Sequence, residues 1–479
     1  MSKKIGGVVA LAGMCALSLF LLNCGSSSSR PSGLLYVLTQ GSNGTGNNVS
    51  SFAIDLRSGN LSLINSNAST CKPAGGSCGL PLNIVLDPTG AAAFVLNQGV
   101  PCQQDPTTKK CVVDKNNTPT VSVPPTIYPY TVGSDGTLSS LGTPILLSHP
   151  LSPQDTEDDA DIAVAMVRDS AGQFLFEINK GSNPTPANCP HEPDPAKEFD
   201  ACPSISVFSM KPGSTGLTLV GGAVVNGKPA PLRLSRIPTA LSAVTFPAPS
   251  GGTTPPCGFT TSEEFLYVTS SQDLSPQHND NTLSVYCVDS SGKLANMTPN
   301  PPYNPQPNPL SVQAVNTNPA GQNSGGVFVY VGSQPTGSGA LSIFQMCTAV
   351  GNAGCTQPDV TNALLKPVGT SPTSVGQNPV GMVVDPTNNF LYVVCEVQGA
   401  VYGFRINTTA GTLTPLNPAN LQTGSQPVAM AMHSTGKFLY TSNSGSSNIS
   451  GFTVSTTSGS MSSLPTVNAP AAPSGMVAR

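Results

Sequence analysis

The cysteines are the residues whose spacing most directly implies chemistry in this sequence of 479 residues, which contains 13 of them. Four close pairs lie in segments rich in polar residues: Cys71 with Cys78, Cys102 with Cys111, Cys189 with Cys202, and Cys347 with Cys355. Short-range pairs of this kind indicate disulfides in an exported protein. We predict a fifth disulfide between Cys257 and Cys287, which leaves Cys395 alone among the later cysteines. Because no Cys-x-x-Cys or nearby His completes a set of zinc ligands, we expect neither a metal nor another cofactor.

A run of acidic side chains offers the oxygen ligands that Ca²⁺ prefers. The run comprises Asp155, Glu157, Asp158, Asp159 and Asp161. It lacks the spacing and the glycine of a calcium-binding loop, which favours a solvated acidic link over a calcium site. Among the histidines, His433 stands at a turn where other repeats carry Asp87 and Asp385, so we expect it to be structural.

The N-terminus has the layout of a secretory signal, with two lysines, an apolar run over 8–22, and then Cys24 followed by glycine and four serines. The leucines before Cys24 resemble the lipobox of bacterial lipoproteins, although Asn23 stands where a smaller residue is usual. We predict a signal peptide over 1–23 and a lipid-anchored linker over 24–33. Acylated Cys24 would hold the protein in the bacterial cell envelope, at the periplasmic face of a membrane or at the cell surface. An ordinary signal peptide that is cut nearby is the alternative.

The composition is poor in charge and rich in turn residues. Charged residues make up 9 % of the chain, while there are 48 glycines and 47 prolines. This balance is typical of all-β proteins with many short strands. The formal net charge of −4 gives no indication of a nucleic-acid partner.

A strand motif of the form apolar-aromatic-apolar recurs along the whole chain. Its seven copies begin at Leu35, Ala93, Leu175, Leu266, Val329, Leu391 and Leu439. Each copy precedes a second strand with a central aromatic residue: Phe52, Tyr130, Phe208, Tyr286, Phe344, Phe404 and Phe452. Tight turns with glycine follow this strand, and a segment of small and apolar residues precedes the motif. Seven units of four antiparallel strands predict a seven-bladed β-propeller over 34–479.

The two ends of the chain complement each other. The segment 473–478 matches an inner strand with no aromatic strand after it, whereas Leu35 begins an aromatic strand with no inner strand before it. We therefore expect the C-terminal strand to join the first blade and close the ring, which removes the open edges. A six-bladed ring or an array of β-sandwiches is the alternative.

The long insertions fall on one face of the predicted ring, where the second strand connects to the third and one blade connects to the next. We expect the binding surface on this looped face. A polar or small residue ends the aromatic strand near it in each blade: Thr39, Asn97, Asn179, Ser270, Ser333, Cys395 and Asn443. These side chains would bind a hydroxyl-rich ligand, or else cap strand ends and order channel water.

The segment 390–396, with Val401-Tyr402-Gly403-Phe404 after it and the Asp-Pro-Thr-Gly and Ser-Gly-x-Leu turns elsewhere, resembles the lactonase-like propellers, which include 6-phosphogluconolactonases and carboxymuconate cyclases. The resemblance covers roughly residues 34 to 479. It implies a lactone-hydrolysing site with Glu, His and Arg at the channel mouth. Glu396 matches the glutamate of the family's Asn-Glu motif, with Cys395 in place of the asparagine. The family's Arg-His pair is absent, since Gln377-Asn378-Pro379-Val380 occupies its place.

Two hypotheses follow for the function. The first is a membrane-anchored binding or scaffold module, predicted to be monomeric, that engages a glycan, a peptide or a small molecule at the channel mouth and contacts the lipid bilayer through its anchor. The second is a hydrolase of a sugar lactone, in which Glu396, Arg236 and Lys180 form the catalytic set. The missing Arg-His pair favours the first hypothesis.

Overall fold

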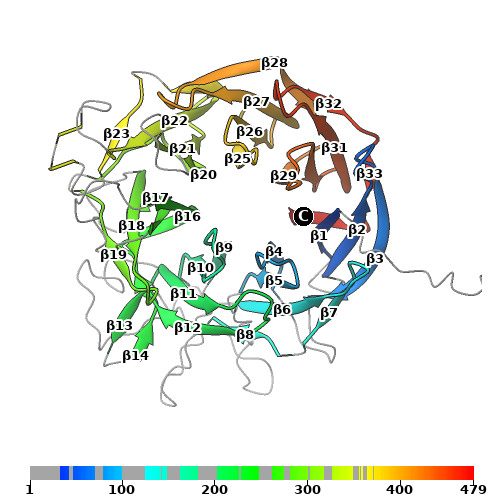
Figure 1. The fold of residues 1–479 in the computed structure, drawn as a ribbon, viewed down its shortest axis with the longest axis horizontal. Coiled ribbons are helices and arrows are strands. Elements are labelled where there is room, and N and C mark those ends of the chain that lie inside the picture. Colours follow the sequence, from blue (N-terminus) through cyan, green and yellow to red (C-terminus); the bar gives the residue numbers. More distant parts are fainter. Residues whose placement is uncertain are drawn as a thin grey trace, which may run out of the picture.

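The protein is seen in a computed structural model that describes most of the chain after Gly33. The described ranges are 33–41, 47–70, 79–99, 125–141, 143–147, 162–181, 202–225, 228–247, 262–273, 281–299, 302–317, 326–348, 355–356, 358–359, 364–369 and 372–479. Seven antiparallel sheets, here numbered as blades 1 to 7 along the chain, stand around a common axis (Figure 1). The predicted seven-bladed β-propeller is confirmed.

The strands of each blade are ordered from the axis outward. Blade 1 consists of β34 (Ala472–Ala478), β1 (Leu34–Gln40), β2 (Asn48–Ile54) and β3 (Leu61–Ser69), and blade 2 consists of β4 (Pro81–Leu86), β5 (Ala92–Asn97), β6 (Thr126–Val132) and β7 (Leu138–Ser140). Blade 3 consists of β9 (Ala163–Arg168), β10 (Phe174–Asn179), β11 (Ser204–Met210) and β12 (Leu217–Gly221), and blade 4 consists of β16 (Arg236–Pro247), β17 (Ser262–Asp273), β18 (Thr282–Val288) and β19 (Leu294–Asn296).

Blades 5 to 7 follow the same order. Blade 5 consists of β20 (Pro309–Asn316), β21 (Val327–Ser333), β22 (Gly339–Met346) and β23 (Leu365–Pro367). Blade 6 consists of β25 (Pro379–Val384), β26 (Phe390–Cys395), β27 (Ala400–Ile406) and β28 (Leu413–Gln422), and blade 7 consists of β29 (Pro427–Met432), β30 (Phe438–Asn443), β31 (Asn448–Val454) and β32 (Met461–Ser463). Short strands extend some blades: β8 (Ile145–Leu146), β15 (Leu232–Arg233), β24 (Thr373–Val375) and β33 (Val467–Asn468). A separate two-stranded sheet contains β13 (Ala223–Val225) and β14 (Lys228–Ala230).

The register of the second and third strands is the same in every blade. The first residue of each apolar-aromatic-apolar motif lies opposite the central aromatic residue of the next strand: Leu35↔Phe52, Ala93↔Tyr130, Leu175↔Phe208, Leu266↔Tyr286, Val329↔Phe344, Leu391↔Phe404 and Leu439↔Phe452. A slip of one residue would turn every apolar side chain to the other face of its blade. The repeated pairing thus fixes which side chains enter the contacts between blades.

The C-terminal strand closes the ring as predicted. Strand β34 pairs antiparallel with β1, with Met476 opposite Val37 and Val477 opposite Tyr36. In the described residues, the main hydrophobic clusters each join two consecutive blades, and one of them joins blade 7 to blade 1 through Tyr440, Phe52 and Met476. The core is therefore a cycle of interfaces between blades.

Tyrosine hydroxyls add a directed contact to several of these interfaces. The tyrosine of the second strand donates to a glycine carbonyl in a turn of the following blade: Tyr36 to Gly136 (3.1 Å), Tyr330 to Gly411 (3.0 Å), Tyr392 to Gly459 (2.8 Å) and Tyr440 to Gly59 (2.8 Å). Gly411 has φ of 73°, and a Cβ there would lie 2.3 Å from a ring carbon of Phe328. Only glycine fits such a turn against the neighbouring blade.

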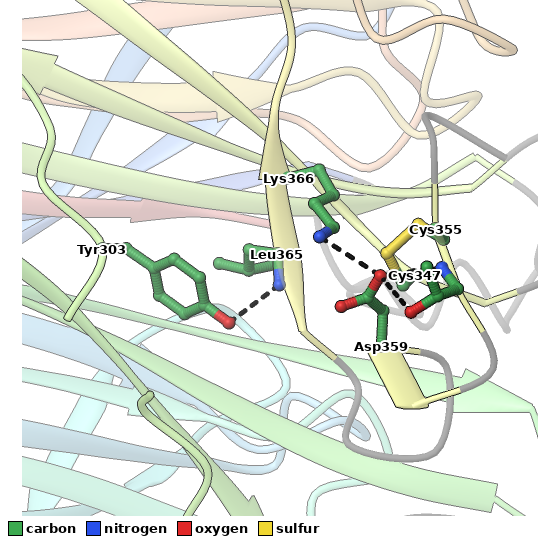
Figure 2. A network of polar contacts seen from close by, with 7 residues as sticks. Tyr303, Cys347, Cys355, Asp359, Leu365 and Lys366 are labelled. Atoms are coloured by element: carbon green, nitrogen blue, oxygen red, sulfur yellow. Dashed lines mark hydrogen bonds and ion pairs between the residues drawn. A yellow bond between two sulfur atoms is a disulfide. The ribbon is translucent and has the colours of Figure 1, made fainter. Parts of the chain in front are cut away.

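A disulfide between Cys347 and Cys355 holds the outer edge of blade 5 (Figure 2). Nearby, the ammonium of Lys366 in β23 lies 3.2 Å from the carboxylate of Asp359. The hydroxyl of Tyr303 accepts a backbone N–H of β23 at 2.8 Å. The pair predicted from its spacing is confirmed, and it anchors the segment that leads into this outer strand.

The other predicted disulfides are described only in part. Cys202 and Cys287 are each disulfide-bonded, while their predicted partners Cys189 and Cys257 lie outside the described residues. The predicted pairs Cys71 with Cys78 and Cys102 with Cys111 also lie outside them, as do the acidic run over 155–161 and the predicted signal peptide, linker and Cys24. In the described part of the chain, no helix has the length and apolar character needed to cross a membrane.

Candidate functional site

A polar cleft of about 570 Å³ lies on the looped face between blades 6 and 7. Three segments form it: the turn 396–399 between β26 and β27, the link 422–426 between β28 and β29, and the turn after β30. Its lining residues are Asn378, Glu396, Val397, Gln398, Gly399, Gln422, Thr423, Gly424, Ser425, Gln426 and Ser446. The cleft thus occupies the predicted face, but over two blades whose connections are short.

Two residues that line the cleft, each directly before an inner strand, have a left-handed backbone conformation. Asn378 has φ of 52° and Gln426 has φ of 51°, a region that residues other than glycine adopt rarely. Each precedes a proline, and its carbonyl accepts a backbone N–H from the end of the aromatic strand: Glu396 to Asn378 and Ser444 to Gln426, both at 2.9 Å. Strained residues of this kind gather at binding sites. Asn308 has the same conformation in blade 5, so the feature also belongs to the repeat.

Glu396 contributes the only carboxylate among the described residues that line the cleft. It follows β26 directly and is half-buried. The side-chain amide of Asn378 donates to Oε2 at 3.4 Å, and no described residue donates to Oε1. This arrangement orients the carboxylate and leaves Oε1 able to accept a hydrogen bond from a ligand.

The opposite wall is held by polar side chains of blade 7. Asn443, at the end of β30, donates to Asn448 Oδ1 (2.7 Å) and to Ser450 Oγ (2.9 Å). Ser450 Oγ in turn accepts the N–H of Gly424 at 3.1 Å. A Cβ at Gly424 would lie 2.2 Å from Ser446 Oγ, so only glycine lets the link approach this turn. Asn443 is therefore a positioning residue for the cleft wall.

The seven predicted polar or small residues at the strand ends are all buried: Thr39, Asn97, Asn179, Ser270, Ser333, Cys395 and Asn443. Several bond within the fold, since Thr39 donates to Asn48 O, Asn97 to Thr70 O, and Asn179 to Ser204 Oγ. These contacts agree with the strand-capping alternative. Cys395 is a free, buried thiol, and burial raises its pKa to about 12, which suits an unreactive packing residue. Direct ligand contact by the seven stays a prediction.

The predicted catalytic set is distributed over three blades. Glu396 follows β26 in blade 6, Arg236 begins β16 in blade 4, and Lys180 follows β10 in blade 3. Only Glu396 lines the cleft. The structure therefore places one member of the set in the candidate site, and the catalytic role of all three stays a prediction.

His433 lies in a turn on the opposite face, as expected. Its Nδ1 accepts the N–H of Thr435 at 3.2 Å and lies 2.8 Å from the hydroxyl of that residue. Asp87 and Asp385 bind the equivalent threonines, Thr89 and Thr387. Burial lowers the pKa of His433, which favours the neutral ring that can accept these bonds.

Most residues of the cleft lining are not predicted by the sequence. The link residues and Gln398 carry no catalytic motif, and neutral amides and hydroxyls are common in any loop. One signal was present, because Gly376-Gln377-Asn378-Pro379 and Gly424-Ser425-Gln426-Pro427 repeat a Gly-x-x-Pro spacing before β25 and β29. Across the described ranges, no three side chains of the metal-binding types lie together.

Comparisons with known proteins agree with this architecture. No curated protein sequence matches the chain. The family described as "Lactonase, 7-bladed beta-propeller" matches residues 355–473, a range that contains the whole cleft lining.

Three solved structures resemble the fold at low sequence identity. A candidate 6-phosphogluconolactonase from Bacteroides fragilis has a TM-score of 0.56 and 12 % identity, over 95 % of this chain and 99 % of that one. The periplasmic gluconolactonase of Pseudomonas aeruginosa has a TM-score of 0.53 and 14 % identity, over 93 % and 98 %. A protein from Lactobacillus plantarum has a TM-score of 0.50 and 12 % identity, over 93 % and 99 %. The segment 355–473 thus resembles the family of seven-bladed lactonase propellers, and the chain as a whole has the fold of a seven-bladed β-propeller.

Proposed function

We propose that this protein is a binding module of the cell envelope that holds a hydroxyl-rich ligand, a glycan or a small sugar, in the cleft between blades 6 and 7. The observation that carries the proposal is the lining of the cleft, in which amides, hydroxyls, one carboxylate and the exposed side chain of Val397 surround about 570 Å³. A volume of this size suits a small ligand. Side-chain amides both donate and accept hydrogen bonds, as sugar hydroxyls do.

Binding rather than turnover is supported by the groups that the cleft lacks. Hydrolysis of a lactone needs a general base and preorganised donors for the developing oxyanion. Glu396 supplies a carboxylate, but none of the described cleft residues is a lysine, arginine or histidine. Several backbone N–H groups of the cleft donate within the protein, including those of Glu396, Gly399 and Thr423.

A glycan array probed with the purified protein tests this proposal. Ser425 is exposed in the cleft, so Ser425→Trp should fill the cleft and abolish the signals of the wild type. Ser462→Trp is the matched control, because Ser462 is exposed in the outer strand β32 and does not line the cleft. Equal signals for the wild type and Ser425→Trp would exclude the cleft as the site, and an array without any signal would contradict glycan binding.

Lactone hydrolysis is the second candidate, favoured by the family match over the segment that holds Glu396. In this case Glu396 would activate the water that attacks the lactone carbonyl. Assays on a panel of sugar lactones should then show turnover that Glu396→Gln abolishes. Absence of turnover on every lactone would exclude hydrolysis and leave the binding proposal intact.

The envelope location is supported by the predicted lipid-modified Cys24 and by the Cys347–Cys355 disulfide, which an oxidising compartment maintains. The Pseudomonas aeruginosa protein of similar fold is named a periplasmic gluconolactonase.

A further inference from the structure

We infer that the cleft between blades 6 and 7 selects sugars without phosphate and prefers those that carry an amino group. This inference rests on the proposed binding function and specifies its ligand. It follows from two properties of the cleft: which hydrogen-bond donors are already used, and which charge remains.

Six of the eleven residues that line the cleft direct their backbone N–H groups into the protein. A phosphate bound without cationic side chains needs free backbone N–H groups, as at helix N-termini or in nests. The six bonds, each written from the residue that gives the N–H to the accepting atom, are Asn378 to Gln334 Oε1, Glu396 to Asn378 O, Gly399 to Glu396 O, Thr423 to Gly399 O, Gly424 to Ser450 Oγ and Ser425 to Ser446 Oγ. These six N–H groups are not available to an anion.

Two hydroxyl groups of the lining are used in the same way. Thr423 Oγ1 donates to Gly424 O at 2.8 Å, and Ser446 Oγ donates to Asn448 Oδ1 at 2.9 Å. The side chains left for a ligand are the amides of Gln398, Gln422 and Gln426, the hydroxyl of Ser425 and the carboxylate of Glu396. This set binds hydroxyls, but it offers an anion only neutral donors.

The charge of the cleft acts against phosphate. Glu396 is the one ionisable side chain among the described lining residues, and no lysine, arginine or histidine among them balances it. A phosphate in the cleft would lie near this carboxylate without a counter-charge, whereas an ammonium would be attracted to it. Because Oε1 accepts no bond from a described residue, it is the atom we expect the ammonium to contact.

Titration with D-glucose, D-glucosamine and D-glucose 6-phosphate tests the inference, at about pH 6 where the amino group is protonated. For the wild type we expect D-glucosamine to bind more tightly than D-glucose, and D-glucose 6-phosphate to bind at least about tenfold more weakly than D-glucose at low salt. Glu396→Gln keeps the shape of the side chain and should remove the preference for D-glucosamine. Ser425→Trp identifies binding in the cleft, with Ser462→Trp as its control.

The outcomes separate this inference from the proposed function. If D-glucose 6-phosphate binds in the cleft as tightly as D-glucose, the selection against phosphate is wrong while sugar binding stands. A preference for D-glucosamine that persists in Glu396→Gln would contradict the role of the carboxylate. If none of the three sugars binds while the glycan array gives signals that Ser425→Trp abolishes, the inference is overturned and the proposed glycan site stands.

Discussion

Glu177 is a buried carboxyl in the middle of β10, at a position where most other blades carry valine. Its exposed fraction is 0 %, and Ser206 lies opposite it in the register. Burial raises its pKa from 4.5 to about 8, because a charged carboxylate is disfavoured away from water. The folded protein therefore holds a proton here at neutral pH that the unfolded chain releases.

The pH dependence of stability follows from this difference. Between about pH 4.5 and pH 8 the native state binds more protons than the unfolded state, so the free energy of unfolding should fall as the pH rises through this window. Glu177→Gln removes the titrating group. We expect it to leave stability at pH 4 nearly unchanged and to raise it by a few kcal/mol at pH 9, since one pKa unit corresponds to about 1.4 kcal/mol.

Urea unfolding at both pH values measures this effect. Glu396→Gln is the matched control, because it makes the same chemical change at a half-buried side chain and should leave the pH dependence in place. Equal pH dependence in the wild type and Glu177→Gln would show that Glu177 is ionised in the folded protein.

Hydrogen bonds from tyrosine hydroxyls join neighbouring blades. Tyr392 is fully buried, and its hydroxyl donates to Gly459 O at 2.8 Å. Tyr392→Phe removes this bond and leaves the carbonyl without that donor, so we expect a loss of about 1 kcal/mol in the free energy of unfolding.

Chemical denaturation of Tyr392→Phe tests this contact. Tyr128→Phe is the control, since the Tyr128 hydroxyl makes no hydrogen bond within the described residues and its loss should change stability little. Equal losses for the two variants would mean that the bond to Gly459 contributes no stability.

The strands and their pairing could be predicted from the sequence because the apolar-aromatic-apolar motif and the aromatic strand after it occur seven times. The aromatic residues of β26 and β27 fix that register through apolar burial, which is visible in the order of residues. The sequence could not predict the cleft, because the shape of the cleft depends on how the link 422–426 packs against the turn after β30. Hydrogen bonds of Asn443 and Ser450 determine that packing. The sequence likewise could not distinguish a strand-end residue that binds ligand from one that holds a link.

At the scale of the whole molecule, β34 joins the last part of the chain to the first blade. Removal of residues 472–479 would expose the inner edge of β1 and the cluster around Tyr440. We expect the truncated protein to melt at a clearly lower temperature than the full chain, and Met476→Asp to act in the same direction because Met476 is buried. Melting temperatures equal to that of the wild type would contradict closure of the ring by the tail.

Attachment to a membrane is tested at Cys24. We expect cells fed labelled palmitate to incorporate it into the wild-type protein and not into Cys24→Ser, which should be released from the membrane fraction. Label that persists in Cys24→Ser, or a wild type without label, would contradict the lipid anchor.

Amide hydrogen exchange with and without the neutral sugar that gives the strongest array signal tests the sugar site most directly, because it reports where the ligand binds. We expect addition of the sugar to slow exchange in the segments 396–399 and 422–426 that line the cleft, and to leave exchange unchanged in Ser425→Trp. Protection confined to other blades, or the same protection in Ser425→Trp, would contradict it.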